Sequence, residues 1–146
     1  MSIADGRRLP PEVFGLDRER LRQGWYSDHY FNNIALILGR LAAEGYRYGG
    51  NPPRAGVPDP QSLAVGDAVV EMQFFCKREP YSIAAGVDNA LAILSECCGY
   101  AAADGFHPTA DQLEVEAVQD GAKLPPWQPA IRVRGRYRDF AILETP

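Results

Sequence analysis

The segment VVEMQFFCKREP constrains the fold more than any other part of the chain. Its apolar side chains stand at alternate positions: Val70, Met72, Phe74 and Cys76. In an extended backbone these side chains fall on one face, and the polar side chains between them fall on the other. Pro80 lacks the backbone N–H that a sheet requires, so it closes the segment. We therefore expect a half-buried strand that needs partner strands.

Two segments have the three-and-four spacing of apolar residues that is typical of amphipathic helices. The first runs from Asp28 to about residue 44 and precedes Gly45, a residue type that commonly follows the last turn of a helix. The second follows Ser82, whose hydroxyl can cap it, and stops before Gly99. We expect these segments to be the two main helices.

The C-terminal half of the chain predicts further strands. LEVEAVQDG alternates apolar and acidic residues and ends in a turn signal, and two short strands are expected around AIRVRG and RYRDFAILE. Residues 46–62, dense in Gly and Pro, predict a loop. The order of elements indicates an α+β fold with a mostly antiparallel sheet. We divide the chain into an N-terminal arm at residues 1–23, with one short helix across LDRERLRQ, and one domain at residues 24–146.

Composition argues against several classes of function. The formal net charge is -4, so bulk electrostatics draws the chain neither to nucleic acid nor to an anionic membrane. No apolar run approaches the roughly 20 residues that span a bilayer. Three cysteines, with no signal-like stretch at the start, indicate a reducing, cytoplasmic setting. Because the chain has neither a zinc-ligand spacing nor a nucleophile motif, we expect no metal site and no catalytic residue in it.

The stretch GWYSDHYFNN surrounds one Ser-Asp pair with aromatic residues. Structurally, Ser27 or Asp28 can accept hydrogen bonds from the free N–H groups of a helix start, with the aromatics fixing the entry of the chain. Functionally, an aromatic ring one turn into a helix can stack on a flat ligand, and the helix N-terminus favours an anion. A flat, anionic ligand satisfies both requirements. The two interpretations remain open at this point.

Two groups of basic residues also allow two interpretations. Lys77 and Arg78 end the predicted strand, where side chains are either solvated or reach a site beyond the sheet. Four arginines recur at period two: Arg132, Arg134, Arg136 and Arg138. On one face of a strand pair they form either the solvated side of an amphipathic sheet or a surface for phosphate or RNA.

Four stretches, taken in order, resemble the nicotinate phosphoribosyltransferases, with quinolinate and nicotinamide phosphoribosyltransferases as more distant relatives. They are YSDHYF, MQFFCKREP followed by AAGVDNALAIL, LEVEAVQDGAKLPPWQPAIRVRG, and the closing FAILETP. The resemblance covers residues 24–146. Each stretch is short, and it is the ordered set that carries the resemblance.

The resemblance implies an α/β-hammerhead-like N-terminal domain of a type II phosphoribosyltransferase, followed in the family by an α/β barrel that holds most of the catalytic groups. FAILETP ends in a Thr-Pro pair of the kind that opens a helix, so we expect the chain to be truncated at the start of the barrel. The family joins nicotinate and phosphoribosyl pyrophosphate into nicotinate mononucleotide in NAD biosynthesis, coupled to ATP hydrolysis. ATP and Mg²⁺ are thus implied for the full-length enzyme, and no cofactor is implied for this chain alone.

The resemblance also implies partners and site residues. In the family, subunits form a head-to-tail homodimer in which the N-terminal domain of one covers the barrel of the other. The Asp-x-Tyr motif of the family matches Asp28-His29-Tyr30, which makes Tyr30 the residue that stacks on the pyridine ring and Asp28 a nearby hydrogen-bond acceptor. Ser27 stands where relatives more often have Thr. Lys77 and Arg78 are expected to assist phosphates across the interface.

Three hypotheses follow from the sequence. The chain is the substrate-covering domain of a nicotinate phosphoribosyltransferase and is inactive alone. Alternatively, it is a stand-alone, non-catalytic module that docks on a separately encoded barrel. A third hypothesis is an RNA-binding domain that uses the face from Arg132 to Arg138.

Overall fold

The computed structural model describes residues 8–49 and 63–146, so most of the predicted loop at 46–62 and the first seven residues of the predicted arm lie outside the description. The helical elements are η1 (Pro11–Phe14), α1 (Arg18–Arg22), α2 (His29–Ala43), η3 (Val65–Asp67), α3 (Val87–Cys97), η4 (Ala110–Gln112), α4 (Tyr137–Phe140) and η5 (Ala141–Leu143). The strands are β1 (Val69–Phe75), β2 (Ser82–Ile83), β3 (Gly99–Ala102), β4 (Gly105–Pro108), β5 (Glu114–Ala117), β6 (Lys123–Leu124) and β7 (Pro129–Arg136).

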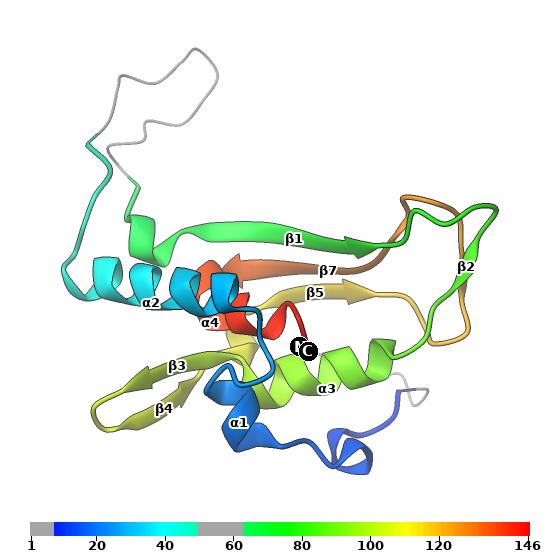
Figure 1. The fold of residues 1–146 in the computed structure, drawn as a ribbon, viewed down its shortest axis with the longest axis horizontal. Coiled ribbons are helices and arrows are strands. Elements are labelled where there is room, and N and C mark those ends of the chain that lie inside the picture. The colour runs from blue at the N-terminus through cyan, green and yellow to red at the C-terminus, as the bar shows by residue number, and fades with distance from the viewer. Residues whose placement is uncertain (1–7, 50–62) are drawn as a thin grey trace.

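The main sheet has the order β1-β7-β5, and all of its pairs are antiparallel. Val133 of the central strand β7 stands opposite both Met72 and Val115 and is completely buried. The pairs β2-β6 and β3-β4 form separate two-stranded sheets, and the β3–β4 hairpin projects away from the main sheet (Figure 1). The predicted α+β fold with antiparallel sheets is confirmed, and the described residues form no closed barrel.

The core lies between the main sheet and α3. This helix buries most of its length, whereas none of the side chains of α2 is fully buried. Phe140, which follows β7, is 2% exposed and joins the same core as Leu91 and Leu94 of α3. Helix α2 packs instead on α4, η3 and η5, at the edge of the molecule (Figure 1). The two predicted main helices are therefore present, one central and one peripheral.

The boundaries of α2 agree with the sequence. Asp28 is the N-cap, and Gly45 adopts the left-handed conformation, with φ of 63°. The N–H of Tyr46 bonds to the carbonyl of Leu41 at 2.9 Å, and that of Gly45 bonds to Ala42 at 3.1 Å. This pair of bonds is the Schellman motif, which satisfies carbonyls that the helix end leaves free. The predicted strand after it is likewise confirmed as β1.

The predicted cap of α3 was wrong. Ser82 lies in β2, opposite Leu124, and the helix starts five residues later. Its cap comes from a distant turn: the two carboxylate oxygens of Asp120 accept hydrogen bonds from the N–H groups of Val87 and Asp88, each at 3.0 Å. Asp120 lies in the connection between β5 and β6, more than 30 residues after the start of the helix. The residues that precede α3 therefore carry no sequence signal for this cap.

The predicted strand around RYRDFAILE was also wrong. This segment forms α4 and η5, and it buries Phe140, Ala141 and Leu143. Together with the partly buried Tyr137, these side chains have helical three-and-four spacing, which the alternation of Arg with apolar residues obscured. The sequence analysis also missed the β3–β4 hairpin and the β2–β6 pair, since strands this short have too few residues to show a period.

The N-terminal segment is fixed to the domain by a buried carboxylate. Asp88 on α3 pairs with the guanidinium of Arg8 at 2.9 Å and accepts the N–H of Leu9 at 3.0 Å. Arg8 also donates to the carbonyl of Ala117 at 2.9 Å. Helix α1 packs on α3 as well, and the guanidinium of Arg22 donates to the carbonyl of Glu96 at 2.6 Å. The described part of the predicted arm is therefore packed against the core.

We predict that Asp120→Ala lowers the free energy of unfolding by about 1–2 kcal/mol, because two N–H groups at the start of α3 lose their acceptor. Asp120→Asn keeps one oxygen acceptor and should cost less. Chemical denaturation of both variants measures the effect. Equal stability of Asp120→Ala and the unmodified chain would contradict the cap.

We also predict an acid-dependent contribution from Asp88. The N–H of Leu9 and the guanidinium of Arg8 lower the pKa of this carboxyl below its ordinary value. A lowered pKa in the folded state contributes stability above about pH 4, and that stability is lost as the pH falls through the folded pKa. Unfolding measured from pH 2 to 6 should therefore depend less on pH in Asp88→Asn. Asp111→Asn, at an exposed position, is the control and should keep the full dependence.

Candidate functional site

The turn before α2 is held by a small set of hydrogen bonds. Asp28 accepts the N–H of Tyr30 at 2.8 Å through Oδ1, and its own N–H donates to Thr145 Oγ1 at 3.2 Å. Asn32 donates from its side chain to the carbonyl of Gly24 at 3.1 Å. The hydroxyl of Ser27 is buried and has no hydrogen-bond partner among the described residues. Of the two predicted caps, Asp28 is therefore the one used.

Three aromatic side chains of this stretch are exposed. Trp25 is 69%, Tyr26 47% and Tyr30 64% accessible, and Phe31 is partly buried. Trp25 donates a hydrogen bond to the side chain of Gln23, and Tyr26 donates one to Asp17. Both rings are therefore bonded to the residues that cap the two ends of α1. The ring of Tyr30 meets that of Phe31 edge to face, with centroids 5.2 Å apart. This geometry leaves much of the Tyr30 ring accessible at the first turn of α2.

A half-buried acidic pair lies next to this turn. The phenol of Tyr137 donates to the carboxylate of Glu144 at 3.4 Å. Burial, the charge of Glu144 and the nearby phenol of Tyr30 raise the pKa of Tyr137 to about 12. Burial also raises the pKa of Glu144. Glu144 directly precedes Thr145, whose hydroxyl accepts the N–H of Asp28.

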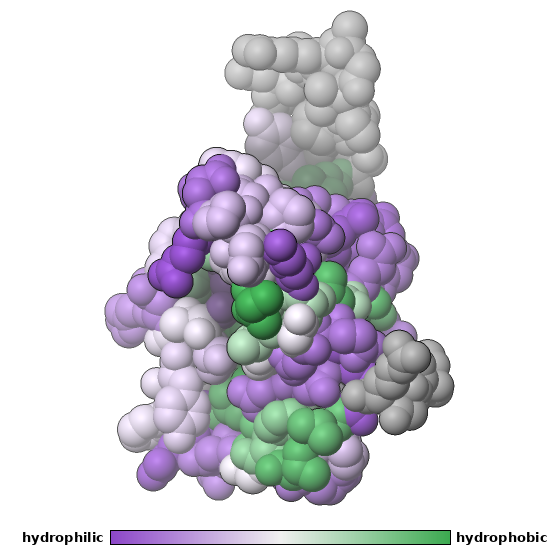
Figure 2. All heavy atoms as spheres, turned by 90° about the vertical axis from the view of Figure 1, so that its right-hand side faces the viewer, coloured by the Kyte–Doolittle hydropathy of each residue, from purple (hydrophilic) through white to green (hydrophobic). Residues whose placement is uncertain are grey.

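The structure does not bring Lys77 and Arg78 to this turn. They follow β1 at the end of the sheet where β2 lies (Figure 1). The ammonium of Lys77 lies 4.8 Å from the centroid of the Trp127 ring. Arg78 borders a cavity of about 510 Å³ that Ser82 and Val87 also line. Figure 2 shows this end of the molecule, where apolar side chains lie in patches between hydrophilic ones.

A larger groove of about 1100 Å³ runs between α2 and β3. His29 and Leu36 of α2 line one side, and Tyr100 and Arg138 line the other. Leu36 is 73% exposed, so this apolar side chain of α2 is left uncovered by the described residues. The groove begins at the same turn of α2 that carries Tyr30.

Four arginines on one face of a strand pair were predicted; Arg132, Arg134 and Arg136 do alternate along β7, and the prediction was wrong for Arg138, which lies in α4. Arg132 and Arg134 do lie on the exposed face of β7, where they pair with glutamates at distances from 2.9 to 3.3 Å: Glu71, Glu116 and Glu114. These contacts agree with the interpretation of this face as the solvated side of the sheet. Glutamates of the neighbouring strands neutralise the charges of Arg132 and Arg134. Arg136 is at the end of β7 and Arg138 is in α4, because the chain turns into a helix there.

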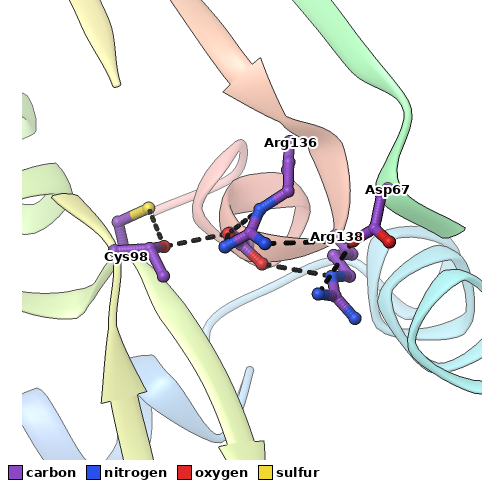
Figure 3. A network of polar contacts seen from close by, with 6 residues as sticks. Asp67, Cys98, Arg136 and Arg138 are labelled. Atoms are coloured by element: carbon purple, nitrogen blue, oxygen red, sulfur yellow. Dashed lines mark hydrogen bonds and ion pairs between the residues drawn. The ribbon is translucent and has the colours of Figure 1, made fainter. Parts of the chain in front are cut away.

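Arg136 and Arg138 converge instead on a buried carboxylate, Asp139, which is 2% exposed (Figure 3). Asp139 accepts from Arg136 at 3.0 Å and from the hydroxyl of Thr109 at 2.9 Å. Arg138 lies 3.5 Å from the other oxygen of Asp139 and reaches Asp67 of η3 at 2.9 Å. This network was not predicted from the sequence. Its one sequence signal was the spacing Arg-x-x-Asp, which is common on helices.

Two further findings limit what the described residues can bind or span. The described residues contain no group of three or more His, Cys, Asp or Glu side chains that could hold a metal ion. Among the helices of the described ranges, none is long and apolar enough to cross a membrane. The structure thus defines an α+β domain with an exposed, hydrogen-bonded aromatic turn and two cavities.

Comparison with known proteins assigns the family. The sequence model of the quinolinate phosphoribosyl transferase N-terminal domain matches residues 59–146, and the chain belongs to this family. The matched range includes Lys77 and Arg78 but not Ser27, Asp28 or Tyr30. It supports the N-terminal domain of a type II phosphoribosyltransferase.

One solved structure is similar, the crystal structure of nicotinate-nucleotide pyrophosphorylase from Pyrococcus furiosus. The TM-score is 0.54, the sequence identity is 19%, and the match covers 89% of this chain. The structural match therefore covers more of the chain than the family match to residues 59–146 does, and at this identity it shows a similar fold only. This chain spans 25% of the length of that protein. A search of curated proteins gave no significant match.

The site also yields a prediction about cysteine reactivity. The hydroxyl of Ser82 and the N–H of Arg78 lower the pKa of the exposed Cys76, whereas burial raises the pKa of Cys97 and raises that of Cys98 to about 11. The thiolate is the form of cysteine that reacts with dithiobis(nitrobenzoate). At pH 8 the native chain should therefore release about one equivalent of thionitrobenzoate from this reagent rapidly, and the remaining thiols should react only on denaturation. Cys76→Ser should abolish the rapid phase. Reaction of all three thiols at one rate would contradict it.

Proposed function

We propose that this chain is the N-terminal, substrate-covering domain of a nicotinate phosphoribosyltransferase, with the α/β-hammerhead arrangement. Nicotinate and phosphoribosyl pyrophosphate would be joined into nicotinate mononucleotide on a barrel, coupled to ATP hydrolysis. The domain contributes one wall of that site, in a head-to-tail homodimer, and has no activity by itself. We place this activity in the cytoplasm, in line with three cysteines that form no disulfide.

The exposed ring of Tyr30 is the single observation that carries the proposal. The Asp28 cap holds the backbone of Tyr30 on the first turn of α2, while the residue as a whole remains 64% accessible. Offset stacking of a pyridine ring on a phenol contributes about 0.5–1.5 kcal/mol beyond the burial of area. This is enough to position a substrate and too little to bind it tightly. The role of the domain is therefore to orient the pyridine, with Asp28 fixing the turn.

The remaining groups have smaller roles in the proposal. Ser27 would contribute to substrate binding beside Asp28, and its hydroxyl is buried with no hydrogen-bond partner among the described residues. Lys77 and Arg78 would assist phosphates from the far end of the sheet, in a part of the interface separate from Tyr30. In this proposal ATP and Mg²⁺ would bind on the barrel.

An alternative assembly keeps the same site. In it the chain is a stand-alone, non-catalytic module that docks on a separately encoded barrel and supplies Tyr30 to it. Reading the coding DNA downstream of Pro146 distinguishes the two forms: a barrel encoded in frame identifies a domain, and a stop codon identifies a module.

A mixing experiment tests the function in either form. The chain is combined with the barrel identified in this way, and formation of nicotinate mononucleotide is measured with nicotinate, phosphoribosyl pyrophosphate, ATP and Mg²⁺. We predict that Tyr30→Phe retains activity, because the ring is kept, and that Tyr30→Ala raises KM for nicotinate by about tenfold or more. Tyr81→Ala, at an exposed tyrosine beside Lys123, is the matched control and should behave as the unmodified chain.

Either of two results would contradict the proposal. The first is full activity of Tyr30→Ala in the reconstituted enzyme. The second is a preference for quinolinate over nicotinate, which would keep the family and overturn the substrate.

A further inference from the structure

Strand β1 forms an open edge of the main sheet. The strand order is β1-β7-β5, so a strand pairs with β1 on one side only. Among the described residues, β7 is also the only element that packs along the length of β1, and Figure 1 shows β1 as the outer strand of the sheet. An open edge presents unpaired N–H and C=O groups that can pair with a strand of another chain.

Hydrogen bonds at the two ends of β1 show which of its backbone groups face outward. Just before the strand, the N–H of Tyr137 donates to the carbonyl of Ala68 at 3.0 Å. Just after it, the N–H of Trp127 donates to the carbonyl of Cys76 at 2.9 Å. Backbone groups of successive residues point to opposite sides of an antiparallel strand, so the even-numbered residues face β7. The residues whose N–H and C=O groups face away from the sheet are therefore Val69, Glu71, Gln73 and Phe75.

The two edges of the sheet differ in their protection against pairing. Strand β5, at the other edge, has four residues, and two of them are glutamates. Short strands and charged side chains are common protections of sheet edges, as are lysine and proline. Strand β1 has seven residues and contains neither lysine nor proline, and its one charged residue, Glu71, is paired with Arg132. Val69 is 54% and Phe75 43% exposed, so pairing at this edge would cover apolar surface.

The sequence of β1 is complementary to itself. In an antiparallel pair of two copies centred on Met72, apolar side chains face apolar ones and a carboxylate faces an amide. The facing residues are Val69 with Phe75, Val70 with Phe74, and Glu71 with Gln73. This register also sets the outward-facing backbone groups of the two copies opposite each other, so that they can exchange hydrogen bonds.

Other registers that keep the backbone groups paired match the side chains less well. Centring the pair on Glu71 would set two carboxylates directly opposite each other, which is unfavourable. Centring it on Gln73 would set Glu71 opposite Phe75. In the register centred on Met72, the amide of Gln73 has a second N–H beyond the one that it donates to Glu71 of its own strand at 3.1 Å. That second N–H can be donated to Glu71 of the second copy.

We propose that β1 pairs with β1 of a second copy of this chain, which joins two three-stranded sheets into one continuous sheet. The contact is isologous, because both copies use the same surface. Edge pairing of one short strand buries a small area, so the dimer should be weak and should depend on protein concentration. The inference does not depend on the proposed function, since it concerns only the edge of the sheet.

The first experiment measures self-association of the full chain by sedimentation equilibrium, from micromolar to millimolar concentration. We expect a reversible monomer–dimer equilibrium. Gln73→Glu sets a carboxylate opposite Glu71 of the second copy at two symmetric places and should raise the dissociation constant about tenfold. Gln73→Lys sets an ammonium group there and should lower it. Within one copy, position 73 stands opposite Arg132, so the new carboxylate has a partner in its own sheet, and thermal unfolding checks that both variants are folded.

The second experiment tests the register with cysteines, in a Cys76→Ser background because the other two cysteines are buried. Met72 faces its own copy, at a Cα–Cα distance of about 4.5 Å for a pair without hydrogen bonds, which suits a disulfide. Met72→Cys should therefore form a covalent dimer on oxidation with diamide. Val70→Cys is the matched control, since it faces Phe74 and should stay monomeric on a non-reducing gel.

Three results would overturn the inference. The first is a chain that stays monomeric at every concentration. The second is a dimer whose dissociation constant is the same in Gln73→Glu and Gln73→Lys, because another surface would then hold it together. The third is a Val70→Cys variant that cross-links as efficiently as Met72→Cys, which would exclude the register centred on Met72.

Discussion

The buried carboxylate of Asp139 is the interaction on which the C-terminal part of the structure depends. It joins the end of β7, through Arg136, to Thr109 after β4, and Arg138 extends the network to Asp67 beside α2. A carboxylate buried this deeply is stable only when it is paired and hydrogen-bonded, so removing one partner is expected to cost more than a surface ion pair would. By turning the chain from β7 into α4, the network creates the surface on which α2 packs. The position of Tyr30 follows from that packing.

Helix α2 lies at the edge of the domain, so the proposed site around Tyr30 forms only one wall of a substrate pocket. A helix with no fully buried side chain and an exposed apolar residue such as Leu36 gains little stability from its own domain. The same exposure leaves the ring of Tyr30 accessible. A barrel that covers this face would gain apolar area and would bring its phosphate-binding groups toward the ring. In the proposed function the stacking would contribute orientation, and the bond-making chemistry would belong to the barrel.

How far the sequence predicts this structure depends on whether the signal is local. The period of β1, the extent of α2 and the Gly45 end of that helix were predicted because the relevant contacts lie within a few residues. The Asp120 cap of α3 and the Asp139 network were not, because their partners lie about 30 residues apart. The resemblance singled out Tyr30, and its accessibility is consistent with the role proposed for it.

The central claim is that the ring of Tyr30 stacks on the pyridine of the substrate across an interface. The most direct test is the intermolecular nuclear Overhauser effect between nicotinate ring protons and ¹³C-labelled tyrosine of this chain, recorded in complex with an unlabelled barrel. The account predicts cross-peaks from the pyridine to the Tyr30 ring that disappear in Tyr30→Ala. Cross-peaks that lead only to side chains of the barrel would contradict it.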